Sequence, residues 1–254
     1  MTADIPVKSL KKALDLLTIL AFEDLKREGC PLTALAHRMK MPVNTVHNLL
    51  KTMVACGYMA QTETGTYVIG PRMTDMGRLN GMLSAVASPR VRKRLDGLCH
   101  AVEEAVTMAT LADGRRVLLC QVDPRTMVRV DAARLEERNL FARPTGRVLA
   151  AFASSEELTR VLVQYGMPGA EWDGITSRKA LTTALEKVRR RGYELIASDT
   201  SELAAFAVPV VDATGALLGS LGCYAPAFRC GPERYESILS QLRQAAADLV
   251  EMLR

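Results

Sequence analysis

Residues 32–58, LTALAHRMKMPVNTVHNLLKTMVACGY, decide how the first part of this chain folds. Apolar residues recur there at helical spacing in two short runs, with Met41-Pro42 between them. Because residues three and four positions apart share one face of a helix, each run predicts an amphipathic helix. Pro42 favours the start of the second helix, and Gly57 its end. The apolar positions are Leu32, Leu35, Ala36 and Met39 in the first run and Val46, Leu49, Leu50, Met53 and Val54 in the second.

Acidic residues are missing from the same region. No Asp or Glu occurs from residue 29 to residue 62, although acids flank this window on both sides. A surface without acids repels no phosphate, so the window is typical of a surface that faces nucleic acid; an ordinary basic patch is the alternative. Within it, Arg38, Lys40 and Lys51 supply positive charge, and His37 and His47 are two of the chain's three histidines.

The flanking segments extend the pattern. A first helix is predicted from about residue 10 to residue 22, with Ser9 as its N-cap. Residues 58–61 and 66–69 predict two short strands around Thr62-Glu63-Thr64-Gly65. Two short helices joined by a tight turn allow the second to enter a major groove, and the hairpin would then form a wing. Three-helix bundles with other functions share this periodicity, so spacing alone leaves both interpretations open.

Length and composition exclude several classes of protein. The chain has 254 residues, of which 48% are hydrophobic and 24% charged, so it can bury one large core or two modest ones and is not disordered. No apolar run approaches the roughly 20 residues of a membrane span, and the first residues form no secretory leader. We therefore expect a cytoplasmic protein with no membrane partner. The net charge of +5 is weak evidence for nucleic acid by itself.

The reactive side chains give little support to catalysis. The six cysteines include no C-x-x-C pair and five lie in or beside apolar stretches, so we expect buried, reduced thiols, no metal site and no cofactor. No histidine occurs after His100, which leaves the later part of the chain without an imidazole base. Ser220 superficially resembles a nucleophile turn, but Gly219-Ser220-Leu221-Gly222 is not G-x-S-x-G. We expect that the chain is not an enzyme.

The remaining sequence predicts an α+β domain built on an antiparallel sheet. A methionine-rich stripe over residues 73–88 is typical of a core or of a dimer seam. Asp113-Gly114, between two strand-like runs, is a strong indicator of a hairpin. Helices are expected over residues 89–106, 145–152, 155–165, 177–191 and from 232 onward, and strands over 107–112, 117–122, 193–197, 203–211 and 216–224.

Short motifs spread over nearly the whole chain belong together. The first part contains Leu35-Ala36, Met41-Pro42, Thr45-Val46-His47, Leu49-Leu50, Gly57-Tyr58, Tyr67 and Gly70-Pro71-Arg72. The second part contains Thr145-Gly146-Arg147-Val148-Leu149-Ala150, Ala207-Val208-Pro209-Val210 and the stretch from Gly215 to Pro226. From about Ser9 to Leu253, these motifs resemble the IclR-type family of bacterial transcription regulators.

The resemblance implies a domain organisation and a function. Residues 1–72 would form a winged helix-turn-helix DNA-binding domain, residues 73–88 a linker helix, and residues 89–254 a GAF/profilin-like domain that binds an effector and oligomerises. Such a protein binds double-stranded operator DNA as a dimer or tetramer, and a small molecule, often an organic acid or an aromatic compound, controls it. The alternative is a ligand-independent DNA-binding and oligomerisation protein with a degenerate effector pocket.

In the second helix of the motif, the exposed positions are expected to face the bases. Asparagine can pair with adenine, and a threonine or valine methyl can contact a thymine methyl; a purely capping role for Asn44 is the alternative. The family usually has basic residues near Val43 and Asn48, and Glu63 occupies the wing here, so we infer weaker nonspecific affinity and more reliance on avidity. The predicted DNA-binding residues are Arg38, Lys40, Val43, Asn44, Thr45, His47, Asn48 and Lys51.

In the later domain, the helix start at Thr145-Gly146 offers backbone N–H groups to a carboxylate, unless Thr145 serves only as a cap. Ala205, Gly222 and Tyr224 replace the cysteine and serines that the family often has, and its acidic ligand residue has no secure match, although Asp199 and Glu202 lie nearby. A more apolar cavity with Phe206 in its wall, suited to an aromatic ligand, is the alternative. Arg129 either binds an anion or is solvated. The predicted effector-binding residues are Met127, Arg129, Thr145, Gly146, Leu203, Ala205 and Tyr224.

Overall fold

The computed structural model describes residues 5–24, 26–126, 130, 139–197 and 202–253. The chain divides into two compact units, Met1–Leu79 and Asn80–Arg254, and each has a hydrophobic core of its own. Among the described residues, no helix is both long and apolar enough to cross a lipid bilayer.

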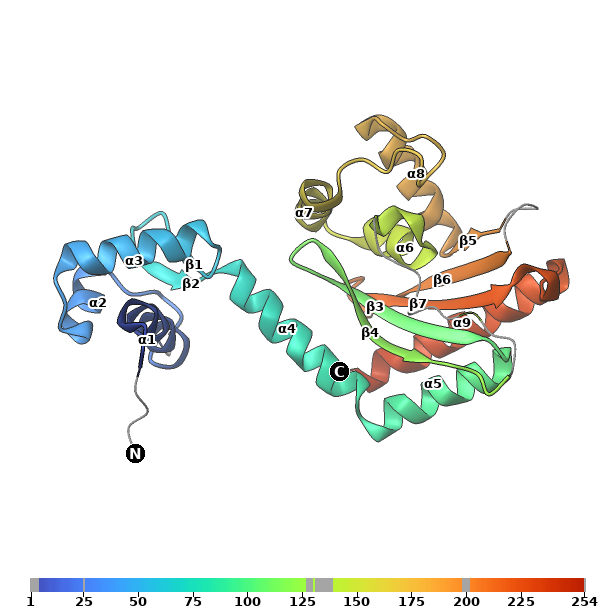
Figure 1. The fold of residues 1–254 in the computed structure, drawn as a ribbon, viewed down its shortest axis with the longest axis horizontal. Helices are drawn as coiled ribbons and strands as arrows, with labels where there is room; N and C mark the ends of the chain where they lie inside the picture. The colour runs from blue at the N-terminus through green and yellow to red at the C-terminus, as the bar shows by residue number, and fades with distance from the viewer. Residues whose placement is uncertain (1–4, 25, 127–129, 131–138, 198–201, 254) are drawn as a thin grey trace. The chain divides into compact units, whose positions relative to one another are not determined.

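The N-terminal unit is a three-helix bundle with a small hairpin. Leu16 and Leu20 of the first helix pack with Leu35, Val46 and Leu50 in one core, because the apolar spacing brings these side chains to the inner face of each helix. The elements are α1 (Lys8–Phe22), α2 (Leu32–Met39), α3 (Val43–Ala55), β1 (Met59–Gln61) and β2 (Tyr67–Ile69) (Figure 1). The predicted order of helices and strands is therefore observed.

The wing hairpin is tied to the start of α2. Backbone N–H groups of Cys30 and Tyr67 each donate to the other residue's carbonyl at 2.9 Å. Gly29 beside this bridge has φ +83°, and a Cβ there would lie 2.9 Å from the Tyr67 carbonyl oxygen, so glycine is required for the close approach. The prediction that Ser9 caps α1 is wrong, because the helix begins at Lys8 and makes no side-chain capping hydrogen bond.

Two helices follow the winged-helix segment in the chain. They are α4 (Pro71–Val86) and α5 (Pro89–Val102), and the Ser88 hydroxyl caps α5 by accepting a hydrogen bond from the Val91 N–H. The methionine-rich stripe of α4 is not a core within one chain, since Met76 is 52% exposed and Leu83 is also exposed. The alternative of a dimer seam stays a prediction.

The C-terminal unit is an α+β domain around a five-stranded antiparallel sheet of order β4-β3-β7-β6-β5. Within this unit, Figure 1 shows α6, α7 and α8 on one side of the sheet and α5 and α9 on the other. The strands are β3 (Ala105–Ala112), β4 (Arg115–Val122), β5 (Glu194–Ile196), β6 (Leu203–Val211) and β7 (Leu217–Pro226), and the further helices are α6 (Pro144–Phe152), α7 (Ser155–Tyr165), α8 (Arg178–Arg191) and α9 (Pro232–Met252).

Turn chemistry fixes the register of the first hairpin. Asp113 and Gly114 both have positive φ, as a two-residue type I′ turn requires. This turn places Leu111 opposite Arg116 and so directs Arg116 to the face of the sheet that carries the buried Leu111.

The cysteines differ from expectation. All six are free, but only Cys99 and Cys223 are buried, whereas Cys56 is exposed and the other three are partly exposed. Burial raises the pKa of both buried thiols. The prediction that all the cysteines are buried is therefore wrong. Cys56, for example, follows an apolar run but lies at the end of α3, where its side chain is exposed.

Candidate DNA-binding and effector-binding sites

The outer face of α3 is exposed and free of acids. Its inner face is formed by Val46, Leu50 and Met53, all buried against the other two helices. Asn44 and Asn48 lie one turn apart near the middle of the opposite face. The predicted base-facing residues, all exposed, are Val43, Asn44, Thr45, His47 and Asn48.

The capping alternative for Asn44 is not observed. Pro42 occupies the N-cap position of α3, and no side chain makes a capping hydrogen bond to this helix. The Asn44 amide is one residue inside the first turn and exposed. Its side chain therefore points to solvent, where a base edge would be met.

The cations around α3 are not equivalent. Arg38 donates to the Glu23 carboxylate, so part of its charge is already balanced within the protein. Lys40 adopts a left-handed conformation, φ +51°, in the turn between α2 and α3, and Lys51 is exposed on α3 itself. Glu63 is exposed at the wing tip. Around α3, electrostatic attraction to phosphate therefore rests mainly on Lys40 and Lys51.

The predicted effector site lies on the face of the sheet covered by α6. The antiparallel register places Ala205 opposite Tyr224, and Gly222 opposite Thr107. A Cβ built on Gly222 would lie 2.5 Å from the Thr145 methyl carbon and 3.2 Å from the Thr107 hydroxyl oxygen. The absence of a side chain at position 222 thus brings α6 and β3 close together at this point.

Buried polar atoms converge on this face. Arg116 is 6% exposed, and its Nε donates to the Thr145 hydroxyl at 3.1 Å. The hydroxyls of Thr107 and Tyr224 are buried, and neither has a hydrogen-bond partner in the described part of the chain. Buried polar groups in native proteins are almost always hydrogen-bonded, so two buried hydroxyls without partners in one region indicate a binding site for a polar ligand.

The start of α6 differs in detail from the prediction. Arg143 is the N-cap, Pro144 is the first helical residue, and Thr145 is fully buried, so Thr145 is not a cap. A Cβ on Gly146 would lie 1.9 Å from the Leu140 carbonyl oxygen, which gives this glycine a packing role. Whether Thr145 and Gly146 also contact an effector stays a prediction.

The Arg147 side chain connects the start of α6 to neighbouring segments of the chain. Its Nε donates to the Phe141 carbonyl at 2.8 Å, its Nη2 donates to the Glu171 carbonyl at 2.8 Å, and its guanidinium lies 4.6 Å from the centre of the Trp172 ring. Nη1 is 3.4 Å from Glu194 Oε1. Burial lowers the pKa of Arg147 and raises that of Glu194, while their mutual attraction opposes both shifts.

The other predicted effector-binding residues fall into three groups. Leu203, Ala205 and Tyr224 come together with Val130 in a small apolar cluster. Met127, Arg129 and Asp199 lie outside the described residues. The prediction that Phe206 belongs to the same site is wrong. Side chains alternate along β6, so Phe206 points to the face opposite that of Ala205, and its ring centre lies 5.4 Å from that of Tyr235 on α9.

Two residues of this site, Thr107 and Arg116, were not predicted. Thr107 begins the predicted strand 107–112, whereas Arg116 lies one residue before the predicted strand 117–122, because β4 starts earlier, at Arg115; the orientation of both side chains depends on strand register. For Arg116 an indicator existed, because a two-residue turn at Asp113-Gly114 determines which residue of β4 faces Leu111. For Thr107 the register with β7 was needed, and no local pattern gives it.

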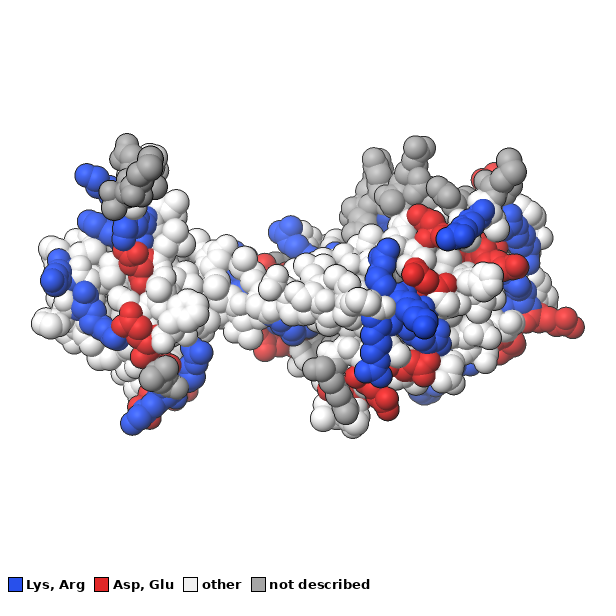
Figure 2. Space-filling model, turned by 90° about the horizontal axis from the view of Figure 1, so that it is seen from below, with Lys and Arg blue, Asp and Glu red and all other residues white. Residues whose placement is uncertain are grey.

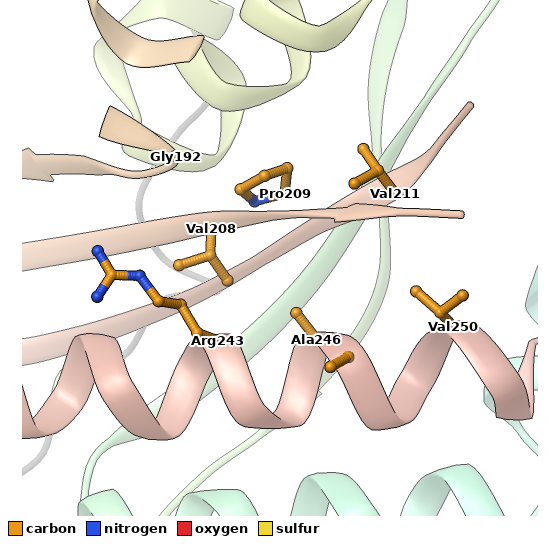
Figure 3. Close-up of a pocket in the computed structure, with 8 residues that line it drawn as sticks. Gly192, Val208, Pro209, Val211, Arg243, Ala246 and Val250 are labelled. Atoms are coloured by element: carbon orange, nitrogen blue, oxygen red, sulfur yellow. The ribbon is translucent and has the colours of Figure 1, made fainter. Parts of the chain in front are cut away.

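A cavity of about 390 Å³ lies on the α9 side of the sheet (Figure 3). The one charged side chain in its lining is Arg243, whose guanidinium lies 5.2 Å from the centre of the Tyr193 ring. Polar groups do not converge on it as they do around Tyr224. The lining residues are Gly192, Val208, Pro209, Val211, Arg243, Ala246, Ala247 and Val250.

Ser220, which superficially resembles a nucleophile, is not accessible. Ser220 is fully buried, and its hydroxyl donates to the Val208 carbonyl at 3.2 Å, so the oxygen is not presented to a substrate. Over the described ranges, no group of three or more His, Cys, Asp or Glu side chains is placed to hold a metal ion.

Known proteins resemble this chain along nearly its whole length. The transcriptional regulator KdgR of Escherichia coli K12 is 28% identical over 94% of this chain and 90% of its own, and the regulator XynR of the same organism is 25% identical over 97% of both. A crystal structure of an IclR homolog from Microbacterium hydrocarbonoxydans, complexed with 4-hydroxybenzoate, shares the fold with a TM-score of 0.52, at 20% identity over 97% of this chain and 99% of that one.

Two family models cover most of the chain. Residues 9–63 match the IclR helix-turn-helix domain, and residues 84–251 match the C-terminal domain of bacterial IclR transcriptional regulators. The first match contains α2, α3 and β1 and nearly all of α1, and the second contains the whole five-stranded sheet. The chain belongs to the IclR family of bacterial transcriptional regulators, with a helix-turn-helix DNA-binding domain and a C-terminal effector domain.

Proposed function

We propose that this regulator reads operator DNA with the outer face of α3 and senses a small molecule held between the start of α6 and strands β3, β6 and β7. The main support for effector binding is that the buried hydroxyls of Thr107 and Tyr224 have no hydrogen-bond partner among the described residues. A bound molecule supplies the missing hydrogen bonds.

The lining defines the chemical class of this molecule. Arg116 contributes a guanidinium close to Thr145, whereas Val130, Leu203 and Ala205 contribute apolar surface. A compact ligand with an aromatic or aliphatic body and a carboxylate or hydroxyl group matches such a lining. Because the fold neighbour from Microbacterium hydrocarbonoxydans is complexed with 4-hydroxybenzoate, this compound belongs in the first set of probes.

Removing single hydroxyls tests the sensing site. Tyr224→Phe and Thr107→Val keep the shape of the side chain and delete one unpaired hydroxyl, so neither lowers the stability of the ligand-free protein. Each weakens a bound ligand by the value of one hydrogen bond, about 0.5–1.5 kcal/mol, or roughly 2- to 12-fold in Kd.

The measurement is thermal unfolding with 4-hydroxybenzoate, benzoate and small 2-oxo acids as probes. A ligand at 100 times its Kd stabilises the protein by about 2.7 kcal/mol. Ligand-free destabilisation by Tyr224→Phe would show that the hydroxyl has a structural partner. Equal stabilisation of wild type and both variants would place the ligand elsewhere.

DNA recognition is tested by selecting bound sequences from random duplexes. Asn48→Ala is expected to relax base preference at one position of each half-site, at a cost of about 1–3 kcal/mol. Lys51→Ala is expected to weaken binding to all sequences alike and to reduce the salt dependence. If Asn48→Ala leaves the selected sequences unchanged, this residue does not read a base.

Control by the effector requires a difference in affinity between two states. A two-fold symmetric assembly presents two α3 helices to two half-sites, and a ligand acts by favouring one arrangement of them. Operator DNA must then change effector affinity by the same factor by which the effector changes operator affinity. Equal effector affinity with and without operator DNA favours the ligand-independent alternative.

A further inference from the structure

The first two turns of α5 carry an unusual concentration of positive charge. Four of the five residues from position 90 to position 94 are cationic. Arg94 is partly buried and donates to the Asp248 carboxylate at 2.7 Å. Arg90, Arg92 and Lys93 are exposed and form no ion pair in the described ranges. We call these three residues the α5 patch. Figure 2 shows Lys and Arg gathered on the C-terminal unit where α5 begins.

The stability of the helix does not account for the α5 patch. The N-terminal end of a helix carries partial positive charge and favours acids, yet the first turn of α5 contains none. Arg90 and Lys93 are also spaced i, i+3, so they repel each other on the helix surface. Both effects cost free energy in the isolated protein, and a negatively charged partner would reverse them.

The basic end of α8 provides the contrast. Its three arginines lie in the last turn, where the helix dipole favours cations. Arg191 pairs with Glu194 at 2.9 Å, and Arg189 donates to the Ala151 carbonyl. Those charges stabilise the fold, whereas those of the α5 patch do not.

The patch continues as a stripe along the outer face of α5. Arg90, Lys93, Gly97 and His100 follow at intervals of three or four residues, opposite the buried side of the helix, and all four are exposed. Ten residues of helix rise about 15 Å, the length of roughly four phosphates along one DNA strand. Asp96, beside Arg92 on the flank, is the one acid within α5, so the stripe stays positive.

We infer that the α5 patch binds the phosphate backbone of DNA beside the operator, an inference that rests on the proposed DNA-binding function. Only Ala87 and Ser88 separate α5 from the linker helix α4. Around α3 the exposed cations outside ion pairs are Lys40 and Lys51, because Arg38 is paired with Glu23 and the wing tip carries Glu63. Contacts from α5 supply the sequence-independent attraction that the recognition surface lacks.

The test compares two triple variants of the full chain on two duplexes. Arg90→Gln/Arg92→Gln/Lys93→Gln removes the α5 patch. Arg178→Gln/Lys179→Gln/Lys187→Gln removes the same charge from exposed positions on α8 and serves as the control. One duplex holds only the selected operator, and the other adds about 20 base pairs on each side, roughly two helical turns. Affinity is measured over a range of salt concentrations.

On the long duplex, the α5 variant is expected to bind more weakly. The slope of log K against log[salt] should become shallower by about 0.9 for each phosphate that the variant no longer neutralises, or by up to about 2.7 per protomer. On the short duplex the α5 variant matches wild type, and the control matches wild type on both duplexes. Urea unfolding followed by Trp172 fluorescence verifies that the variants fold.

Several outcomes overturn the inference. Unchanged binding of the α5 variant to the long duplex excludes the interaction, and an equal loss of affinity in the control shows that only net charge matters. If anionic phospholipid vesicles bind the wild type and release the α5 variant while DNA binding is unaffected, the α5 patch belongs to a membrane surface. Failure of the wild type to bind any selected operator would instead refute the proposed function.

Discussion

Gly146→Ala tests whether this glycine is required by packing at the start of α6. A Cβ there would lie 1.9 Å from the Leu140 carbonyl oxygen and 2.9 Å from the Leu140 side chain. The close atom belongs to the backbone, so it cannot rotate away, and α6 or the segment at Leu140 must shift. Overpacking of this kind typically costs about 1–3 kcal/mol, and can cost more. The gain in helix propensity from Gly to Ala, about 1 kcal/mol, offsets only part of it.

Gly97→Ala is the matched control. Gly97 is also inside a helix, but a Cβ at this position would have no neighbouring atom within 4 Å, so alanine there should stabilise the protein by about 0.5–1 kcal/mol. The two variants are therefore expected to differ by about 1–3 kcal/mol in unfolding free energy. With a urea m-value of about 1–3 kcal/mol/M, this difference corresponds to urea midpoints that lie on the order of 1 M apart.

Trp172 makes the assay specific to this part of the molecule. It is the chain's single tryptophan, it is 5% exposed, and its ring centre lies 6.1 Å from that of Phe141, next to Leu140 in the chain. Urea unfolding followed by its fluorescence reports on the C-terminal unit. If Gly146→Ala unfolds at the same urea concentration as Gly97→Ala, or at a higher one, the packing argument is wrong.

Two further predictions concern buried charge. Arg147→Ala leaves the buried Glu194 with less compensation and is expected to cost about 3–5 kcal/mol, with a change in Trp172 emission; an unfolding midpoint close to that of wild type would contradict it. Burial is the largest influence on the Glu104 carboxyl and raises its pKa despite the Arg229 ion pair. The stability that this raised pKa contributes is therefore present below the pKa of Glu104 in the unfolded state, and it is lost as pH rises through the pKa in the folded state. Glu104→Gln should therefore gain stability relative to wild type as pH rises from about 4 to 7, measured by urea unfolding at each pH, and a constant difference would refute this.

The sequence located the helices of the DNA-binding unit well because their apolar spacing is determined locally. α2 and α3 begin and end where the apolar runs, Pro42 and Gly57 predicted. The N-cap of α1 was not predictable in the same way, since Ser9 is a good capping residue but the helix starts before it. A capping preference of about 1 kcal/mol is easily outweighed by packing.

The effector site was only partly predictable because it depends on strand register. Leu203, Ala205 and Tyr224 were correctly expected to lie together, but Phe206 faces α9. Strand β6 is apolar on both faces, since helices cover the sheet on both sides, and a run without alternation does not show which residues point which way.

The order of elements, the acid-free surface of α3 and the family were determined by the sequence alone, because apolar periodicity, turn residues and charge are properties of neighbouring positions. Tertiary structure decided which side chains meet across the sheet. It brought Thr107, Arg116, Thr145 and Tyr224 to one face and left two hydroxyls there without partners in the described residues. Contacts between distant strands follow from global packing, and a shift of one residue in register would have turned each of these side chains to the opposite face.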